Sequence, residues 1–307
     1  MNNIKQHFLL DPEIHFLNHG SFGACPVPVF ETYQNWQRRL EKQPVLFLGR
    51  EHDSLLKESR IALGSYLNTD ADNLAYIPNA THGVNIVARS LQLRPGDEIL
   101  TTNHEYGACD FTWDFLCAKS GAKTIRQPIP LPVKDEAEVL DQFWAGVSER
   151  TRVIYLSHIT SPTALRLPVE AICQRARQRG ILTVIDGAHA PGQIPLDLSA
   201  IDADFYTGNC HKWMLAPKGA AFLYARRDVQ GLIEPLVVSW GYGSAPGFGT
   251  GSRFVDLLQW TGTHDPAAYL SVPTTIDFMR ANRWDEVRSD CHRLLSEALA
   301  DLQALSG

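Results

Sequence analysis

A carboxylate that follows an apolar run is the first candidate for chemistry in this sequence of 307 residues. Asp186 comes directly after Ile181–Ile185, and two small residues and then His189 follow it. A carboxylate at that depth is costly to desolvate unless a cation or hydrogen-bond donors meet it. A helix N-cap is the simplest interpretation. A protonated pyridine nitrogen is the alternative partner, because a carboxylate beside it would keep such a ring an effective electron sink.

A lysine in an apolar and cationic setting is the second candidate. The strand-like run that begins at Asp204 ends in a polar turn that presents Asn209, His211 and Lys212 together, with Trp213 next in the chain. Most lysines are solvated surface residues, but such surroundings lower a lysine pKa, as Schiff-base chemistry requires. Asn209 and His211 can also donate hydrogen bonds to a phosphate.

A turn before a helix-like run is the third candidate. Residues 78–85 include Asn79, Ala80 and Thr81 and lead into the amphipathic run Val84–Leu91. Backbone N–H groups at a helix N-terminus, together with the Thr81 hydroxyl, suit a phosphate dianion. An N-capped helix without a ligand explains the same residues equally well.

Strand-like and helix-like runs alternate between these candidates. Short, β-branched, mostly apolar runs cover residues 97–102, 151–157 and 181–186, as in strands buried on both faces of a parallel sheet. Helical spacing of apolar residues marks 52–67 and 167–180. The alternation predicts an α/β fold with a large, doubly wound, mainly parallel sheet. Ligands of such sheets bind at the carboxyl ends of the strands, where the candidate residues stand.

The last part of the chain has a different pattern. Residues 239–252 are rich in glycine and predict an irregular connection, and helical patterns follow at 274–281 and 284–305. We therefore expect an N-terminal arm at residues 1–25, a large cofactor-binding domain at 26–272, and the start of a small, incomplete C-terminal domain at 273–307.

Composition excludes several classes of protein. The net charge is −6 and no block of lysine or arginine occurs, so nothing indicates a nucleic-acid or anionic-membrane partner. No run is long and apolar enough for a signal peptide or a membrane span, and a cytoplasmic location follows by default. The six cysteines include no C-x-x-C pair, which argues against a zinc ribbon and a disulfide scaffold.

The order and spacing of these motifs resemble the class V aminotransferases, a family of pyridoxal-5′-phosphate (PLP) enzymes of fold type I. The resemblance extends from Leu17 to Thr263. It rests on the segments Asn79-Ala80-Thr81, Asn103-His104-Glu105-Tyr106, Asp186-x-x-His189 and His211-Lys212. The phrases at residues 18–21, 103–108 and 208–213 look most like the isopenicillin N epimerase branch.

The resemblance implies a role for each matching residue. Lys212 would hold PLP as a Schiff base and carry the α-proton, Asp186 would pair with the pyridine nitrogen, and His189 would contact the ring hydroxyl. His104 or Tyr106 would stack on the ring, and the choice between them stays open; either is a candidate for the opposite-face proton donor of an epimerase. The phosphate would be held by Ala80, Thr81, Asn209 and His211, and Asn79 directly precedes the first of these in the chain. The edge of the cofactor ring would be lined by Thr160 or Ser161.

The resemblance also implies a homodimer. Thr263 resembles a threonine that reaches the phosphate of the neighbouring subunit, and Arg50 is a candidate partner for a substrate carboxylate. One departure is expected to matter: the family carries a carboxylate-binding arginine in a C-terminal domain, and we expect that domain to be truncated or absent here.

Three functions remain open on the sequence. The first is PLP chemistry at the α-carbon of an amino acid, by an epimerase, an aminotransferase or a C–S lyase such as a cysteine desulfurase. The second is a metal-dependent hydrolase that uses Asp186, His189, His211 and His104, although no third ligand lies near Asp186-x-x-His189. The third is a truncated protein that binds PLP without catalysis. We expect no metal.

Overall fold

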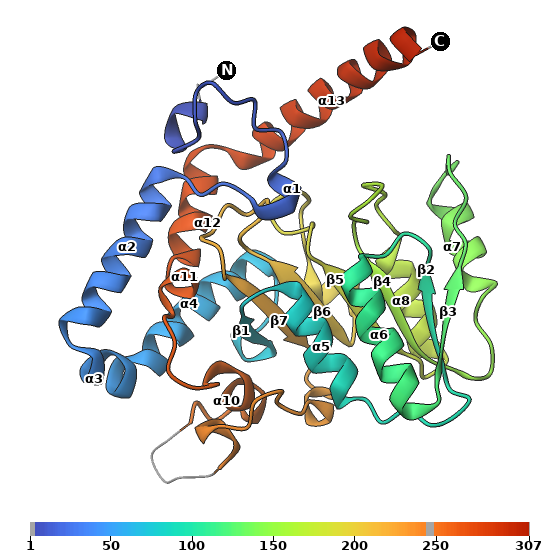
Figure 1. Cartoon of the computed structure of the whole chain (residues 1–307), viewed down its shortest axis with the longest axis horizontal. Helices are drawn as coiled ribbons and strands as arrows, with labels where there is room; N and C mark the ends of the chain where they lie inside the picture. The colour runs from blue at the N-terminus through green and yellow to red at the C-terminus, as the bar shows by residue number, and fades with distance from the viewer. Residues whose placement is uncertain (1–3, 244–248, 307) are drawn as a thin grey trace.

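A seven-stranded sheet forms the centre of the computed structural model, which describes residues 4–243 and 249–306 (Figure 1). The strand order is β1-β7-β6-β5-β4-β2-β3. Strand β7 runs antiparallel to β1 and β6, and the other neighbours are parallel. The strands are β1 (Leu74–Ile77), β2 (Glu98–Thr102), β3 (Lys123–Gln127), β4 (Thr151–Ser157), β5 (Leu182–Gly187), β6 (Phe205–Asn209) and β7 (Ala221–Ala225). The predicted doubly wound, mainly parallel α/β fold is confirmed.

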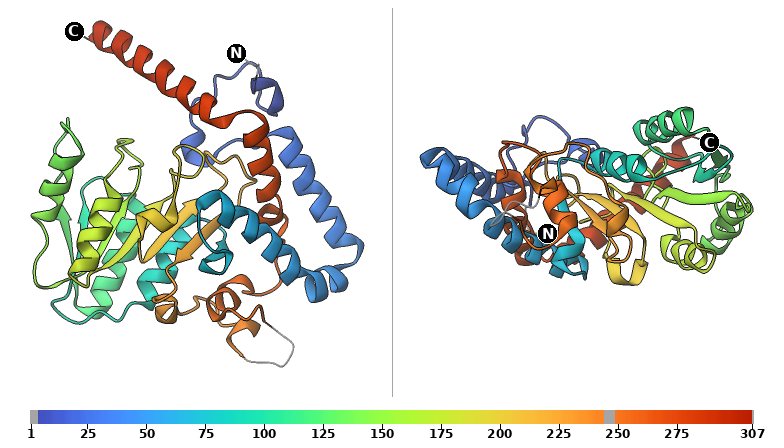
Figure 2. Two further views of the ribbon diagram at one scale, coloured as in Figure 1. Left: turned by 180° about the vertical axis from the view of Figure 1, so that it is seen from behind. Right: turned by 90° about the horizontal axis from the view of Figure 1, so that it is seen from below.

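Helices cover both faces of the sheet (Figure 2). The longer ones are α2 (Val27–Lys42), α4 (His52–Leu67), α5 (Ala80–Ser90), α6 (Gly107–Ser120), α7 (Glu136–Trp144), α8 (Val169–Gln178), α10 (Arg253–Gln259), α12 (Val272–Ala281) and α13 (Trp284–Ser306). The short ones are α1 (His19–Phe22), α3 (Pro44–Leu46), α9 (Leu198–Ile201) and α11 (Ala267–Leu270). Helix α4 has the predicted bounds and ends because Asn68 takes a left-handed conformation. Helix α5 begins four residues before the predicted run, because Asn79 caps it at Ala80.

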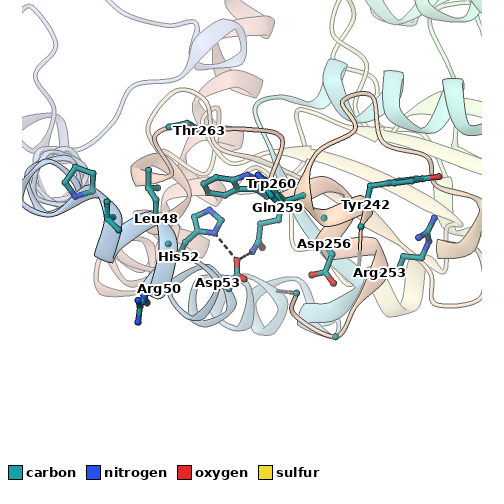
Figure 3. A pocket seen from close by; sticks show the side chains of 18 residues that line it. Leu48, Arg50, His52, Asp53, Tyr242, Arg253, Asp256, Gln259, Trp260 and Thr263 are labelled. Carbon is teal, nitrogen blue, oxygen red and sulfur yellow. Dashed lines mark hydrogen bonds and ion pairs between the residues drawn. The ribbon is translucent and has the colours of Figure 1, made fainter. Parts of the chain in front are cut away.

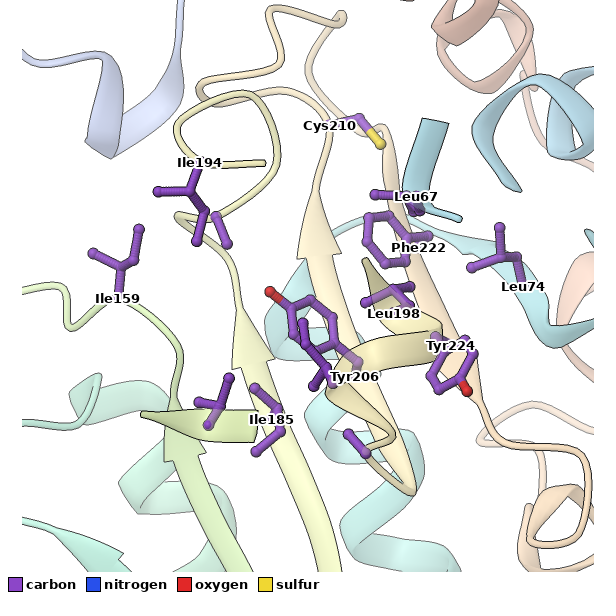
Figure 4. Close-up of a cluster of buried hydrophobic side chains, with 14 of the residues drawn as sticks. Leu67, Leu74, Ile159, Ile185, Ile194, Leu198, Tyr206, Cys210, Phe222 and Tyr224 are labelled. Carbon is purple, nitrogen blue, oxygen red and sulfur yellow. The ribbon is translucent and has the colours of Figure 1, made fainter. Parts of the chain in front are cut away.

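The alternation of side chains along the strands separates two apolar cores. On one face, Val153 of β4 and Val184 of β5 pack with Trp113 of α6. On the other face, Ile185 and Tyr206 pack with residues of α4, α8 and α12, as part of the cluster in Figure 4. A one-residue change in register would exchange the two sets, so burial on both faces fixes the position of Asp186 at the end of β5.

The N-terminal arm and helix α13 lie on the same side of the sheet (Figure 1). The N-terminal arm passes over the carboxyl edge of the sheet, and α13 projects away from the body (Figure 1). Helix α12 places Val272, Ile276 and Met279 in the core shared with α4. The predicted division at residue 272 remains a prediction. Of the glycine-rich connection predicted at 239–252, residues 244–248 lie outside the described part.

Two further findings concern the described residues. None of the helices in residues 4–243 and 249–306 is long and apolar enough to cross a bilayer. In the same residues, no group of three or more histidine, cysteine or acidic side chains is arranged to hold a metal ion.

Candidate active site

The carboxyl ends of β5 and β6 bring the principal candidates to one edge of the sheet. Asp186 stands near the end of β5 and pairs in register with Thr207 of β6, and Asn209 is the last residue of β6. Lys212 lies three residues further, in the connection to β7. The parallel arrangement of β5 and β6 therefore produces the proximity that the sequence predicts.

Asp186 is buried, with 3% of its surface exposed. Its Oδ1 accepts a hydrogen bond from the Ala188 backbone N–H at 2.9 Å, and its Oδ2 accepts from the Tyr155 hydroxyl at 3.3 Å and the Cys109 thiol at 3.7 Å. Within the described residues it makes no ion pair. Burial raises the pKa of this carboxyl, and the hydrogen bonds and the charge of Lys212 only partly oppose that rise. The carboxylate can therefore accept a further, cationic hydrogen-bond donor.

A second buried carboxyl, Glu105, lies close enough to interact electrostatically with Asp186. Glu105 accepts hydrogen bonds from the Ser157 backbone N–H at 2.8 Å, the Ser157 hydroxyl at 2.7 Å and the Thr102 hydroxyl at 2.6 Å. Burial raises the pKa of Glu105 to about 7, and the charge of Asp186 adds to the rise. Glu105 ties the ends of β2 and β4 together and fixes the loop that carries His104 and Tyr106.

Lys212, His189 and Trp213 form a hydrogen-bonded row. Lys212 Nζ lies 3.2 Å from His189 Nε2, and the Trp213 indole N–H donates to His189 Nδ1 at 3.2 Å. Burial lowers the pKa of Lys212, which increases the fraction of neutral, nucleophilic amine. Burial, assisted by the charge of Lys212, lowers the pKa of His189 to about 4, so this imidazole is neutral near pH 7.

The N-terminus of α5 offers donors for an anion. Asn79 caps the helix by accepting from the His82 backbone N–H at 2.8 Å, and the Ala80 N–H donates to Asn209 Oδ1 at 2.9 Å. The Thr81 backbone N–H and hydroxyl have no hydrogen-bond partner in the described part of the chain. The next turn lies close to β6, because a Cβ on Gly83 would come within 2.6 Å of Thr207 Cγ2. Of the predicted phosphate donors on α5, Thr81 is the one that remains available.

The ring of His211 contacts the residue that precedes β7. Its Nδ1 lies 3.0 Å from the Ala220 carbonyl oxygen, which can only accept, so Nδ1 carries a proton. Burial lowers the pKa of His211, and the neutral ring therefore presents a lone pair at Nε2. Donation from Nε2 to a phosphate would require His211 to take up a second proton.

The two predicted ring-stacking residues lie in different settings. His104 is buried, and its Nε2 and Nδ1 contact the Ile129 carbonyl at 2.7 Å and the Thr163 hydroxyl at 3.3 Å. Tyr106 caps α6 and is 47% exposed. The Thr160 hydroxyl is used within its own loop, where it contacts the Thr163 hydroxyl at 2.7 Å.

Three other predicted site residues, Ser161, Arg50 and Thr263, are not part of the buried cluster around Asp186 and Lys212. Ser161 is exposed. Arg50 and Thr263 line a cavity of about 1010 Å³ that Lys212 and Asp186 do not line (Figure 3). His52 and Trp260 also line it, and their rings meet edge to face at 5.0 Å between centroids. The structure therefore brings Arg50 and Thr263 to one surface, separate from the lysine of the same chain.

Residues 26–307 match the sequence profile of the family described as "Aminotransferase class-V". The chain belongs to the class V aminotransferase family. The isopenicillin N epimerase of Amycolatopsis lactamdurans is 38% identical over 304 residues, which are 95% of this chain and 76% of that protein. The predicted resemblance to this family, and to its isopenicillin N epimerase branch, is confirmed.

Solved structures of the cystine C–S lyase C-DES are also similar. Its complex with cysteine persulfide is 26% identical with a TM-score of 0.77, and covers 87% of this chain and 72% of that chain. A variant of C-DES with glycine covalently linked to the PLP cofactor is 25% identical with a TM-score of 0.79, over 90% of this chain and 74% of that chain.

Several residues of the site were not singled out from the sequence. Tyr155 and Cys109 bind Asp186, and Trp213 binds His189. Tyr155 is an aromatic position in a buried strand, and Cys109 is an apolar position of a helix. Such residues are usually core residues, so the sequence held no signal that separates them from the core.

Proposed function

We propose that this class V aminotransferase family member binds PLP covalently as a Schiff base at Lys212 and acts at the α-carbon of an amino acid. The observation that carries the proposal is the buried Asp186 carboxylate, which makes no ion pair among the residues that the structure describes and stands within electrostatic reach of a lysine whose pKa is lowered. A protonated pyridine nitrogen would supply the missing cation. PLP supplies an electron sink that stabilises negative charge at the substrate α-carbon.

The other residues fit the remaining parts of PLP. Thr81 and the N-terminus of α5 would hold the phosphate, with the Asn209 side chain behind them. His189 would donate to the ring hydroxyl from Nε2. His104 or Tyr106 would stack on the ring. The contacts of His104 Nε2 with the Ile129 carbonyl and of Nδ1 with the Thr163 hydroxyl lie in the plane of the imidazole, so they fix its orientation and leave its face available.

Epimerisation is the reaction that we favour, because the similar protein from Amycolatopsis lactamdurans is an isopenicillin N epimerase. Cleavage of a C–S bond is the second candidate, and the similarity to the cystine C–S lyase C-DES supports it. Incubation with single amino acids in D₂O separates the two. Epimerisation gives deuterium at the α-carbon and inverted stereochemistry without release of a sulfur product or keto acid. A lyase releases pyruvate and ammonia, together with sulfide from cysteine or cysteine persulfide from cystine. A protein that binds PLP but performs neither reaction, nor transamination, would contradict the proposal.

We also propose that the enzyme is a homodimer in which Thr263 and Arg50 serve the active site of the partner subunit. The cavity that both residues line apart from their own Lys212 supports this arrangement. Mixing Lys212→Ala chains with Thr263→Ala, Arg50→Ala chains tests it: mixed dimers should regain one intact site and about a quarter to a half of wild-type activity. Activity that does not recover in mixed dimers would contradict shared sites.

A cytoplasmic location completes the proposal. All six cysteines are free thiols in the structure, as is usual in reducing compartments. Fractionation of cells that express the tagged protein would test this location.

A further inference from the structure

Trp213 follows the cofactor lysine in the chain, and its indole contacts the histidine beside that lysine. We propose that Trp213 is a positioning residue, whose N–H fixes His189 as the tautomer that donates from Nε2 toward Lys212 and the bound cofactor. The inference rests on the proposed function for the identity of the cofactor, and it adds a residue to which no role was assigned.

The tautomer follows from the hydrogen-bond chemistry of the two rings. An indole N–H can only donate, so His189 Nδ1, at 3.2 Å from Trp213 Nε1, must accept and carries no proton. A neutral imidazole has one N–H, which therefore lies on Nε2. The lowered pKa of His189, about 4, means that the neutral ring predominates near pH 7.

This tautomer places an N–H on the ring nitrogen nearest to Lys212. Nε2 lies 3.2 Å from Lys212 Nζ, so its N–H can donate to this amine when the amine is neutral. The low-pKa environment of Lys212 favours that neutral amine. With PLP held at Lys212, the same N–H would be available to donate to the ring oxygen of the cofactor. The other tautomer would turn a lone pair toward that oxygen and would repel it.

The N-terminal arm holds the indole in place. The His19 ring stacks on Trp213 with 6.1 Å between ring centroids and 28° between planes. A Cβ on Gly20 would lie 3.1 Å from Trp213 Cζ2, so the arm passes close to the indole. Gly23, at φ +69°, allows the chain to approach the His211 carbonyl so closely that a Cβ would lie 2.0 Å from that oxygen. The arm therefore packs against the loop that carries Lys212 and restricts the movement of Trp213.

The direct test is the ¹⁵N spectrum of the histidine rings in the full chain, recorded without PLP. The signals of His189 are assigned by their absence in His189→Asn. We expect a bare, pyridine-like Nδ1 and a protonated, pyrrole-like Nε2 in the wild type. A protonated Nδ1 would overturn the proposal, whatever the stability of any Trp213 variant.

Trp213→Phe then tests the cause, since it keeps an aromatic ring and removes the donor. The two nitrogen signals of His189 should move toward each other as the tautomers mix, and PLP should bind about fivefold more weakly, as expected for one lost hydrogen bond. The matched control is Trp284→Phe, because the Trp284 indole donates to the Gly192 carbonyl at 3.0 Å and not to His189. The control should retain the wild-type spectrum and PLP affinity.

Two results with Trp213→Phe would overturn the proposal. Unchanged His189 signals would show that Trp213 does not set the tautomer, and mixed tautomers with unchanged PLP affinity would show that the tautomer does not serve the cofactor. Failure of the proposed function is distinguishable, because a wild-type chain that never binds PLP would still show the predicted tautomer.

Discussion

The raised pKa of the buried Glu105 carboxyl predicts how the free energy of unfolding depends on pH, and this dependence can be measured. Its pKa is raised from 4.5 to about 7, chiefly by burial. The native state therefore keeps the Glu105 proton to higher pH than the unfolded state, and the stability of the wild type falls as the pH rises through this window. At about 1.4 kcal/mol per pH unit, the contribution lost between pH 4.5 and pH 7 is about 3 kcal/mol.

Glu105→Gln removes the titration and keeps the shape of the side chain. The amide retains one oxygen that can accept from Ser157, although it loses an acceptor for Thr102. We expect the stability of this variant, relative to the wild type, to rise by about 3 kcal/mol between pH 4.5 and pH 7.5 and to be constant outside that range. The sign is fixed, because only the wild type must release a buried proton.

Equilibrium urea unfolding of the PLP-free protein at several pH values measures this difference. Glu170→Gln is the control, because Glu170 is exposed on α8, and its stability should follow the wild type at every pH. Parallel stability curves for the wild type and Glu105→Gln from pH 4 to pH 8 would refute the electrostatic reasoning, since Glu105 would then titrate alike in the folded and unfolded states.

Three further predictions concern the cofactor site. Gly83→Ala should destabilise the fold by about 1–3 kcal/mol in urea unfolding, since its Cβ would meet Thr207 Cγ2 at 2.6 Å, and Thr207→Ser should recover part of this loss; an unchanged stability would contradict the close approach. PLP affinity should weaken as the pH rises above the lowered pKa of free His211, because binding of the phosphate favours the protonated ring. In equilibrium titrations, His211→Asn should show a smaller dependence of PLP affinity on pH. An equal dependence in the wild type and the variant would exclude proton uptake at this ring. Asp186→Asn should retain PLP but lose turnover on the order of 100-fold, the effect of about two pH units in the basicity of the ring nitrogen; wild-type turnover would exclude the proposed pairing.

The sequence predicts the fold well where a pattern is local. The runs at residues 52–67 and 151–157 match α4 and β4, because amphipathic spacing and β-branched apolar content are properties of neighbouring residues. The antiparallel direction of β7, and the place of β1 beside it at the sheet edge, depend on pairing between residues about 150 positions apart in the chain, such as Leu74 and Tyr224. No local pattern encodes that pairing.

In the candidate site, too, local patterns were predictable from the sequence and long-range contacts were not. Asp186 and Lys212 were foreseen because polar residues that follow buried strands are unusual, and the structure brings both to one edge of the sheet. The contacts of Tyr155 and Trp213 could not be foreseen, since they depend on which face of a strand or loop an aromatic ring occupies. The role of Asn79 as a helix cap agrees with the simpler of the two interpretations that the sequence allowed.

The central claim is a covalent link between Lys212 and PLP. The most direct measurement is peptide mass spectrometry of the purified protein after borohydride reduction in the presence of PLP. We predict a phosphopyridoxyl group on Lys212, and none on the same peptide when Lys212→Ala is treated alike. An unmodified Lys212 in a protein with full PLP occupancy, or a label on another lysine, would contradict the account.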